Sequence, residues 1–216
     1  MSLLGEPVGQ LPPSAPARSE IRGRGLILRR PDPVGDVSDL YSATHGAPEC
    51  EAVWEYMGYG PWSDEFQMAG WMASTLDSAD PFWWVVESEG HPVGMAAVLN
   101  VDQIHRRAEI GHIWYVPSVH RTTVNTEAAY LMIRECFETM GSRRVEWKCD
   151  ALNLRSREAA QRLGFVFEGV FRHHMIVKGR NRDTAWFAMT ADDWRGARPM
   201  IEAWLSDPKP GGLRGG

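Results

Sequence analysis

The sequence predicts an α+β domain with a mixed, mostly antiparallel central sheet that is flanked by helices. Strand patterns at 82–87 and 93–99 surround a turn-rich segment and predict an antiparallel hairpin, and the pattern at 106–116 predicts a third strand beside it. A strand–helix–strand–helix succession follows and ends near residue 164. Further strand patterns form a closing hairpin before a final helix, which completes the α+β architecture.

The length of 216 residues suits one domain, because domains typically hold roughly 100–200 residues. The proline-rich stretch 1–20 predicts a flexible N-terminal arm, and the proline- and glycine-rich stretch 207–216 predicts a flexible tail. The folded domain is therefore assigned to 21–206.

The net charge of −5 argues against a nucleic acid or an anionic membrane as a partner, since both require a basic face. The sequence has no apolar run close to the ~20 residues that span a bilayer, and it shows no secretory signal pattern. Its three cysteines, Cys50, Cys136 and Cys149, are widely spaced and odd in number, which favours buried thiols over a disulfide framework. These observations predict a cytoplasmic protein.

The first elements are predicted from short patterns. Leu26–Arg30 is predicted to form a strand, and helices are expected near Asp36–Thr44 and Asp64–Leu76. Ser63 or Asp64 can cap the second helix. Its expected apolar stripe consists of Phe66, Gly70, Trp71, Ala73 and Leu76.

The strand 106–116 alternates in part, so it should place Glu109 on one face of the sheet and His112 on the other. A helix at Thr126–Met140 and a short strand at Val145–Cys149 follow. The remaining expected elements are a helix at Ser156–Leu163 closed by Gly164, strands at Phe165–Val170, Phe171–Lys178 and Thr184–Met189, and a helix at Ala191–Leu205 that Pro199 kinks or divides.

A polar loop lies between the strand 106–116 and the helix that begins near Thr126. Backbone N–H groups at a helix N-terminus suit an anion such as a pyrophosphate, and Arg121 adds a cation. Hydroxyl donors come from Thr122, Thr123 and Thr126. The alternative is an ordinary capped helix.

A second polar loop follows the strand 145–149 and contains Asn153, and Ser156 lies where the next helix begins. Either residue can be a simple helix cap. Alternatively, both side chains face a ligand between the two neighbouring strands.

The run N-x-x-S-x-x-x-x-x-x-L-G-F from Asn153 to Phe165, placed after an Arg-bearing loop, resembles the core of the GCN5-related N-acetyltransferase (GNAT) superfamily. The likeness covers Gly25 to Met189 and is greatest to the RimJ/RimL-like branch. It implies an acyltransferase domain in which two central strands splay apart and admit acetyl-CoA as acyl donor.

The resemblance also implies a donor site. Asn153 would bond the pantetheine arm, and Ser156 would lie near the thiol. In the usual family loop, small residues stand where this chain has Val124 and Thr126. Backbone groups for the pantetheine would come from Ile113, Trp114 and Tyr115, and the pyrophosphate loop would be Arg121, Thr122, Thr123, Val124, Asn125 and Thr126.

Acyl transfer to an amine requires a neutral amine, a fixed carbonyl and protonation of the leaving thiolate. We expect direct attack without a covalent enzyme intermediate, with Ser156 donating to the thiolate and Glu109 as the leading base. A structural, paired role for Glu109 is the open alternative. His173 and His174 are adjacent on a strand and diverge, so no metal site is predicted.

The acceptor is expected to be a primary amine, either a protein N-terminus or a small molecule. The aromatic segment between Trp54 and Trp62 either holds a cationic or aromatic acceptor or forms a lid or dimer contact. The apolar Trp194–Leu205 segment leaves a homodimer open. Two other functions compete: a non-catalytic acyl-CoA-binding module and a protein-interaction module.

Overall fold

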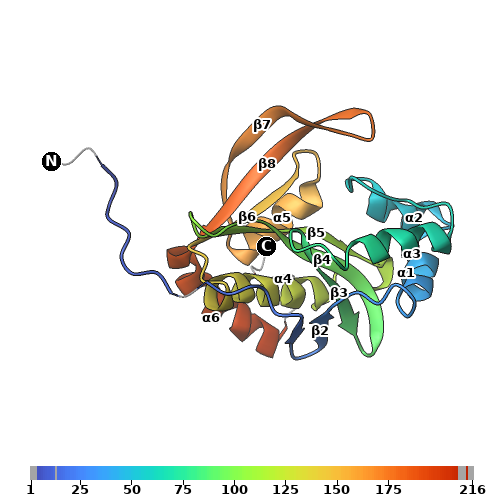
Figure 1. The fold of residues 1–216 in the computed structure, drawn as a ribbon, viewed down its shortest axis with the longest axis horizontal. Coiled ribbons are helices and arrows are strands. Elements are labelled where there is room, and N and C mark those ends of the chain that lie inside the picture. Colours follow the sequence, from blue (N-terminus) through green and yellow to red (C-terminus); the bar gives the residue numbers. More distant parts are fainter. Residues whose placement is uncertain (1–3, 13, 209–212, 214–216) are drawn as a thin grey trace.

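The computed structural model describes residues 4–12, 14–208 and 213. An eight-stranded sheet in the order β1-β2-β3-β4-β5-β6-β8-β7 forms its centre (Figure 1). The strands are β1 (Glu20–Arg22), β2 (Leu26–Arg29), β3 (Phe82–Ser88), β4 (His91–Asp102), β5 (Arg107–Tyr115), β6 (Arg144–Asp150), β7 (Val166–Val177) and β8 (Arg180–Thr190).

Helices cover both faces of this sheet. The α-helices are α1 (Val37–Thr44), α2 (Pro48–Glu51), α3 (Glu65–Ser74), α4 (Val124–Arg134), α5 (Leu154–Leu163) and α6 (Ala191–Ser206). Single turns of 3₁₀-helix lie at Ala52–Trp54 and Pro117–Val119, and a π-helical turn, Glu135–Thr139, extends α4. The predicted α+β fold class, a mostly antiparallel sheet flanked by helices, is confirmed.

The two faces are distinguished by neighbouring residues of β3, since successive side chains of a strand point to opposite faces. Trp83 packs on the ring of Trp71 in α3. On the other face, the indole N–H of Trp84 donates to the Arg18 carbonyl, and the Arg18 side chain binds Glu135, which directly follows α4. We call these the α3 face and the α4 face. Helix α6 packs against α4, where Trp194 stacks on Phe137.

Strands β5 and β6 are the parallel pair at the centre of the sheet. They are paired only from Arg107 to Glu109 on β5 and from Arg144 to Glu146 on β6. Beyond Glu109 and Glu146 the two strands separate, while β5 stays paired with β4 and β6 with β8. The predicted splay of the central strands is therefore present, and it opens an edge of β5 backbone.

A β-bulge in β5 corrects the predicted alternation of this strand. Ala97 is opposite Gly111 but Met95 is opposite Trp114, so β5 carries one extra residue there, and His112 has a positive φ of 53°. The His112 ring lies 4.6 Å from the ring of Trp83. His112 is thus on the α3 face together with Glu109, and the prediction that it alternates to the other face was wrong.

The end of the chain also differs from the prediction. The segments predicted as two strands, 165–170 and 171–178, form the single bulged strand β7, and β8 starts at Arg180 rather than Thr184. Lys178 and Gly179 make a two-residue turn with positive φ at both positions, which gives a long hairpin that projects from the sheet (Figure 1). Strand β1 lies at the end of the predicted arm and was not expected.

The apolar stripe predicted for α3 was right only at Trp71, which is partly buried and packs against the core. Phe66 is 86% exposed, and the buried residues of the helix are Met68 and Met72. Asp64 does cap the helix as predicted, with its carboxylate accepting from the Gln67 backbone N–H at 2.8 Å. The prediction assumed that the large aromatic side chain of Phe66 would be buried. In the structure, the flexible side chains of Met68 and Met72 fill the space above the sheet instead.

Helix α6 is continuous through Pro199 and begins with a capping box between Thr190 and Asp193. Its buried residues, Trp194, Ala197 and Ile201, pack inside the chain. These residues of the apolar face that suggested a homodimer are therefore buried by intramolecular contacts, and the homodimer stays a prediction. Parts of the predicted arm and tail (1–3, 13, 209–212 and 214–216) lie outside the described residues. Within the described ranges, no helix combines the length and the apolar character that a membrane span requires.

Gly94 is a position where the sheet requires glycine. A Cβ there would overlap the Trp114 carbonyl oxygen and stand 2.9 Å from the Tyr115 Cα, so β4 and β5 would have to move apart. We expect Gly94→Ala to lower the free energy of unfolding by about 2 kcal/mol, measured by urea denaturation. Gly70→Ala on exposed α3, where a Cβ meets nothing within 4 Å, should instead stabilise by about 0.5–1 kcal/mol. Equal effects at the two sites would contradict this reading.

Candidate functional site

The loop before α4 presents donors to solvent. Arg121 is exposed with φ 63°, and the N–H groups of Asn125 and Thr126 have no hydrogen-bond partner among the described residues. Helix α4 begins at Val124, two residues earlier than predicted. The side chains of Val124 and Thr126 are buried, so they point away from the exposed loop surface.

Thr122 and Thr123 have local roles in this loop. The Thr122 hydroxyl donates to the Val119 carbonyl at 2.7 Å and accepts from the Val124 backbone N–H at 3.3 Å. Thr123 is the N-cap residue of α4, but its side chain makes no cap hydrogen bond. The loop thus joins a cation, free backbone N–H groups and a helix N-terminus, a combination suited to phosphate oxygens.

The backbone of β5 supplies polar groups along the splay. Ile113 lies in the bulge, and Trp114 and Tyr115 are paired with β4 on one side only. A ring nitrogen of His120 lies 3.1 Å from the Tyr115 carbonyl oxygen, so that carbonyl is already engaged. The Trp114 carbonyl oxygen lies against Gly94 of β4, and the Val116 N–H donates to the Val93 carbonyl of the same strand at 2.9 Å. The backbone groups of Ile113 and Tyr115 are therefore the ones on the side of the opening.

Asn153 and Ser156 lie on the α4 face, at the start of α5. The Asn153 Oδ1 accepts from the Ser156 backbone N–H at 3.1 Å, so Asn153 is the N-cap residue of α5. Its amide Nδ2 has no partner among the described residues. The Ser156 Oγ accepts from the Trp147 indole N–H at 2.9 Å, and the hydroxyl also hydrogen-bonds the neighbouring Cys149 thiol.

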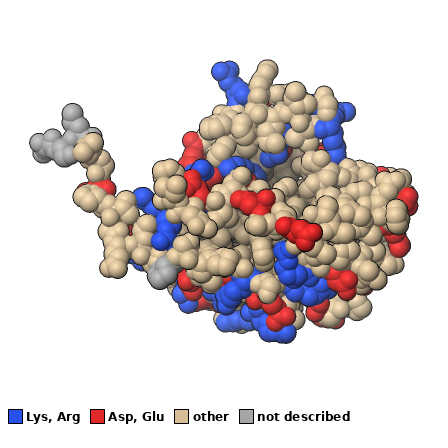
Figure 2. Space-filling view, in the orientation of Figure 1, with Lys and Arg blue, Asp and Glu red and all other residues tan. Residues whose placement is uncertain are grey.

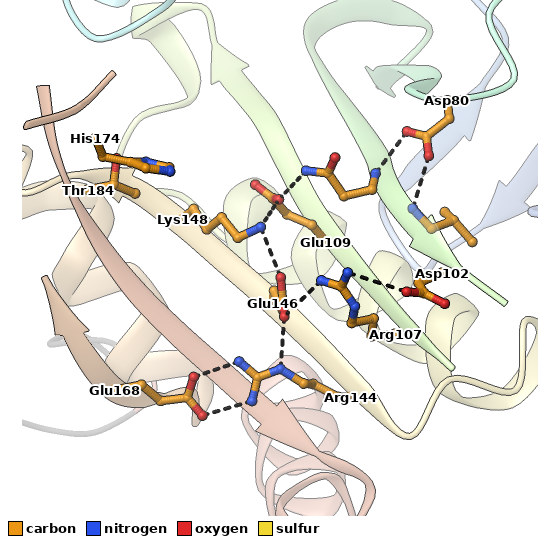
Figure 3. Close-up of polar contacts among 12 residues, drawn as sticks. Asp80, Asp102, Arg107, Glu109, Arg144, Glu146, Lys148, Glu168, His174 and Thr184 are labelled. Atoms are coloured by element: carbon orange, nitrogen blue, oxygen red, sulfur yellow. Dashed lines mark hydrogen bonds and ion pairs between the residues drawn. The ribbon is translucent and has the colours of Figure 1, made fainter. Parts of the chain in front are cut away.

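Glu109 lies on the opposite side of the opening, on the α3 face, because Gly111 two residues later is opposite Ala97, which is opposite Trp83. Figure 3 shows its contact with Lys148. Its Oε2 accepts from Lys148 Nζ at 2.7 Å and from Asn100 Nδ2 at 2.7 Å. Its Oε1 has no hydrogen-bond partner among the described residues. Glu109 is thus a paired carboxylate, as the structural alternative expected, and it still carries one unoccupied oxygen at the point where the strands separate.

Glu146 is the neighbouring carboxylate at the fork, but both of its oxygens are occupied (Figure 3). Oε1 accepts from Arg144 at 2.9 Å, and Oε2 pairs with Lys148 at 2.9 Å. These cations hold the pKa of Glu146 below its usual value, although burial acts in the opposite direction and is the largest single influence. Of the two carboxylates, only Glu109 keeps an oxygen free for a ligand.

Sequence reasoning missed Lys148 and Asn100. Lys148 is largely buried, lies 4.1 Å from the Trp186 ring and bridges both carboxylates. A signal was present, because Glu146 and Lys148 alternate with apolar residues in a central strand, and charges inside such a strand indicate a polar groove. Asn100 lies in a strand of apolar character, and no pattern pointed to it.

Aromatic rings form a closed cluster on the α3 face beside this groove. The ring of Tyr59 stacks on Trp71 at 4.6 Å, and Trp62 packs against Trp54 at 4.9 Å. The predicted aromatic segment is thus occupied by contacts between its own rings, which favours its role as a lid over an open cage for a cation.

Burial in this cluster lowers the pKa of His112 to about 4, and the positive charge of Arg182 acts in the same direction. The folded protein therefore binds a proton here only at a lower pH than the unfolded chain, whose histidine has a pKa of about 6.5. The associated stability is complete above pH ~6.5 and is lost as the pH falls toward 4.

We expect His112→Gln to remove this pH dependence. Between pH 7 and pH 4.5 the wild type should lose about 2 kcal/mol more unfolding free energy than the variant, because protonating His112 favours the unfolded chain. Urea denaturation of both proteins at the two pH values measures the difference. Parallel losses would show that His112 is not the group responsible.

The β7–β8 hairpin closes the other side of the groove. Phe171 packs on Trp186 at 4.6 Å, and His174 lies 3.0 Å from the Thr184 hydroxyl. At the hairpin tip, Lys178 Nζ donates to the Trp54 carbonyl at 2.8 Å. Figure 2 shows a hollow between the hairpin and the region of α1–α3, with charged side chains around it.

Cys149 is not placed to act as a nucleophile. It is buried on the α4 face, and burial raises the pKa of its thiol, so the unreactive protonated form is favoured. Among the residues that the structure describes, no group of three or more histidine, cysteine or acidic side chains is arranged to hold a metal ion.

Comparisons with known proteins agree with this geometry. Residues 25–166, more than half of the chain, match the family model described as an acetyltransferase (GNAT) domain. A GCN5-related N-acetyltransferase from Brucella melitensis superposes with a TM-score of 0.86 and 32% identity, covering 94% of this chain and 93% of that one.

Curated relatives are similar over shorter stretches. The putative ribosomal N-acetyltransferase YdaF of Bacillus subtilis is 30% identical over 110 residues, which are 51% of this chain and 60% of that protein. Spermidine N(1)-acetyltransferase of Escherichia coli K12 is 27% identical over 100 residues, 46% of this chain and 53% of that protein. The matches thus span less than two thirds of either relative.

Proposed function

Because this chain belongs to the acetyltransferase (GNAT) family, we propose that it transfers an acetyl group from acetyl-CoA to a primary amine by direct attack. The separation of β5 from β6 beyond Glu109 and Glu146 carries this proposal, since it opens a slot between two faces of polar groups. The RimJ/RimL-like branch expected from the sequence agrees with the ribosomal N-acetyltransferase relative.

The donor would lie along β5 with its pyrophosphate on the loop before α4. Arg121 and the N–H groups of Asn125 and Thr126 face the phosphates, and they have no other partner among the described residues. Backbone groups of Ile113 and Tyr115 would face the pantetheine, and the Asn153 amide nitrogen is a further donor. The buried side chains of Val124 and Thr126 leave this approach open.

The two catalytic candidates flank the slot from opposite faces. Glu109 on the α3 face accepts the amine proton through its unoccupied Oε1, directly or through a water molecule. The backbone N–H of Ile113, on the side of the opening, stabilises the developing oxyanion. Ser156 on the α4 face donates a hydrogen bond to the leaving thiolate while Trp147 holds its oxygen, and the proton released by the amine balances the charge of the thiolate.

The acceptor would enter from the α3 face, between the aromatic cluster and the hairpin. A protein N-terminus and a small amine both fit the proposal, and the names of the ribosomal and spermidine acetyltransferases represent these two classes. All three cysteines are free thiols, which supports the predicted cytoplasmic location.

Isothermal titration with acetyl-CoA, compared with free CoA, tests the donor site. A thiol-release assay with a panel of amines then tests turnover. Binding followed by amine-dependent thiol release is expected. Binding without turnover for any acceptor would favour a non-catalytic module, and no binding at millimolar acetyl-CoA would overturn the proposal.

Ser156→Ala should lower kcat at least about tenfold, equivalent to roughly 1.4 kcal/mol of barrier, because the thiolate loses its hydrogen-bond donor. The KM for acetyl-CoA should change little, since the lost interaction forms mainly in the transition state. Steady-state thiol release measures both constants. An unchanged kcat would remove Ser156 from the mechanism.

A further inference from the structure

Arg182 on β8 is a partly buried cation without a counterion. Its Nε is fully shielded from solvent and has no hydrogen-bond partner, and its guanidinium forms no ion pair with any of the residues that the structure describes. Buried donors in folded proteins are nearly always paired. A guanidinium left this way is a candidate for binding an anion that the chain itself does not contain.

Arg182 faces the reaction groove. The register of β8 on β6 places Trp186 beside Lys148, so Arg182, Thr184 and Trp186 share the α3 face with Glu109. Burial lowers the pKa of His112, and the positive charge of Arg182 lowers it further. Burial raises the pKa of Cys149, and the Ser156 hydrogen bond and the charge of Arg182 act against that increase. Since these two residues lie three positions beyond the fork on β5 and β6, the guanidinium is close to the space between the separated strands.

The carboxylates of Asp183, Asp150 and Glu109 each accept hydrogen bonds from other groups through one oxygen. Asp183 accepts from the His173 backbone N–H at 2.7 Å and from Asn181 at 2.9 Å. Asp150 accepts from the Leu152 backbone N–H at 2.9 Å, and Glu109 pairs with Lys148. None of them forms an ion pair with Arg182.

The hairpin around Arg182 is basic although the whole chain is acidic. Residues 166–190 contain four lysines and arginines against two acidic residues, a net charge of +2 in a chain of net charge −5. One of the two acids, Glu168, is bound by Arg144 at 2.6 Å. Figure 2 shows lysine and arginine side chains on this hairpin. Such a wall repels a polycation and attracts an acidic ligand.

Trp186 supplies a second unused donor on the same face. Its buried indole N–H has no partner in the part of the chain that the structure describes, and its ring lies 4.1 Å from the Lys148 ammonium. Arg182 and Trp186 are four residues apart, roughly 13 Å along a strand. That separation matches a short extended peptide better than one small ion, because a peptide can reach Glu109 with its amine and Arg182 with a side chain.

We propose that Arg182 binds a carboxylate carried by the amine acceptor, with the Trp186 indole N–H donating to a second polar atom of the same molecule. The substrate class is then a peptide N-terminus with an acidic residue among its first positions, and not a polyamine. A planar guanidinium pairs with a carboxylate through two parallel hydrogen bonds, which gives both affinity and orientation. The inference rests on the proposed function, because it takes the acceptor to be an amine that reaches Glu109.

C-terminally amidated tripeptides test this inference by calorimetry without acetyl-CoA. Asp-Ala-Ala, Ala-Asp-Ala and Ala-Ala-Asp amides are compared with the same peptides carrying asparagine, and with spermidine. At least one acidic peptide should bind about tenfold more tightly than its asparagine counterpart, and spermidine should bind more weakly than that peptide. The preference should vanish in Arg182→Gln and be reduced in Arg182→Lys, which keeps the charge but loses the planar fork.

Arg180→Gln is the matched control, because it removes the same charge from an exposed position of the same hairpin, and it should keep the preference. Equal binding of acidic and amide peptides by the wild type, or an undiminished preference in Arg182→Gln, would overturn the inference. If Arg182→Gln does not fold, an undiminished preference for the acidic peptide in Arg182→Lys would overturn the inference instead. Titration of the wild type with acetyl-CoA tests the proposed function separately, because the peptide titrations contain no acyl donor. Failure of the proposed function can therefore be distinguished from failure of this inference.

Discussion

Arg121→Glu is expected to weaken acetyl-CoA binding about 100-fold, or roughly 2.7 kcal/mol. The exposed Arg121 side chain stands beside the unpaired N–H groups at the start of α4, and a carboxylate there would repel the phosphates that the arginine attracts. Isothermal titration of the variant and the wild type at one ionic strength measures the difference.

Arg180→Glu is the control for this reversal, because it makes the same change of charge on the exposed hairpin. It should leave acetyl-CoA affinity within about twofold, since exposed charges more than a Debye length of about 8–10 Å apart are largely screened. If both variants lose the same affinity, the effect is one of net charge, and Arg121 does not contact the donor.

Glu109→Gln is expected to lower kcat by about 100-fold, because an amide cannot accept the amine proton. The folded state should persist, since Lys148 keeps Glu146 as its partner at 2.9 Å. The rate should rise with pH more steeply in the variant than in the wild type, because deprotonation of the amine in solution then replaces the enzyme base. Thiol-release kinetics with saturating acetyl-CoA measure both.

Glu146→Gln separates catalysis from the stability of the ion-pair network. It removes a carboxylate from the same lysine, but one whose oxygens are both occupied by cations. We expect lower thermal stability and a kcat within a few-fold of the wild type. A loss of less than about tenfold in Glu109→Gln, or equal losses in the two variants, would assign Glu109 a structural role.

Most elements that border the opening could be predicted from local sequence. The hairpin turn at Glu89–Gly90, the cap at Asp64 and the C-terminal Gly164, with φ 102°, are each encoded by a few adjacent residues. The motif from Asn153 to Phe165 predicts the helix that lies beside the slot. Local rules suffice where the energy that selects a conformation comes from neighbours in the chain.

The errors have a common cause in contacts between distant parts of the chain. The bulge at His112 cannot be read from β5 alone, because it depends on the register that β4 imposes. The exposure of Phe66 depends on which face of α3 the sheet covers, and the methionines at 68 and 72 fill that space. Propensity and periodicity do not contain this information.

By itself the sequence determined the α+β class, the family and the two polar loops, because capping residues, turn glycines and short motifs act locally. Only the tertiary structure decided what those residues meet. It paired Glu109 with Lys148, and among the described residues it left the second Glu109 oxygen without a partner and Arg182 without a counterion. Which charges are matched depends on the packing of strands that lie up to about 70 residues apart, from β5 to β8, and it is fixed only when the sheet has formed.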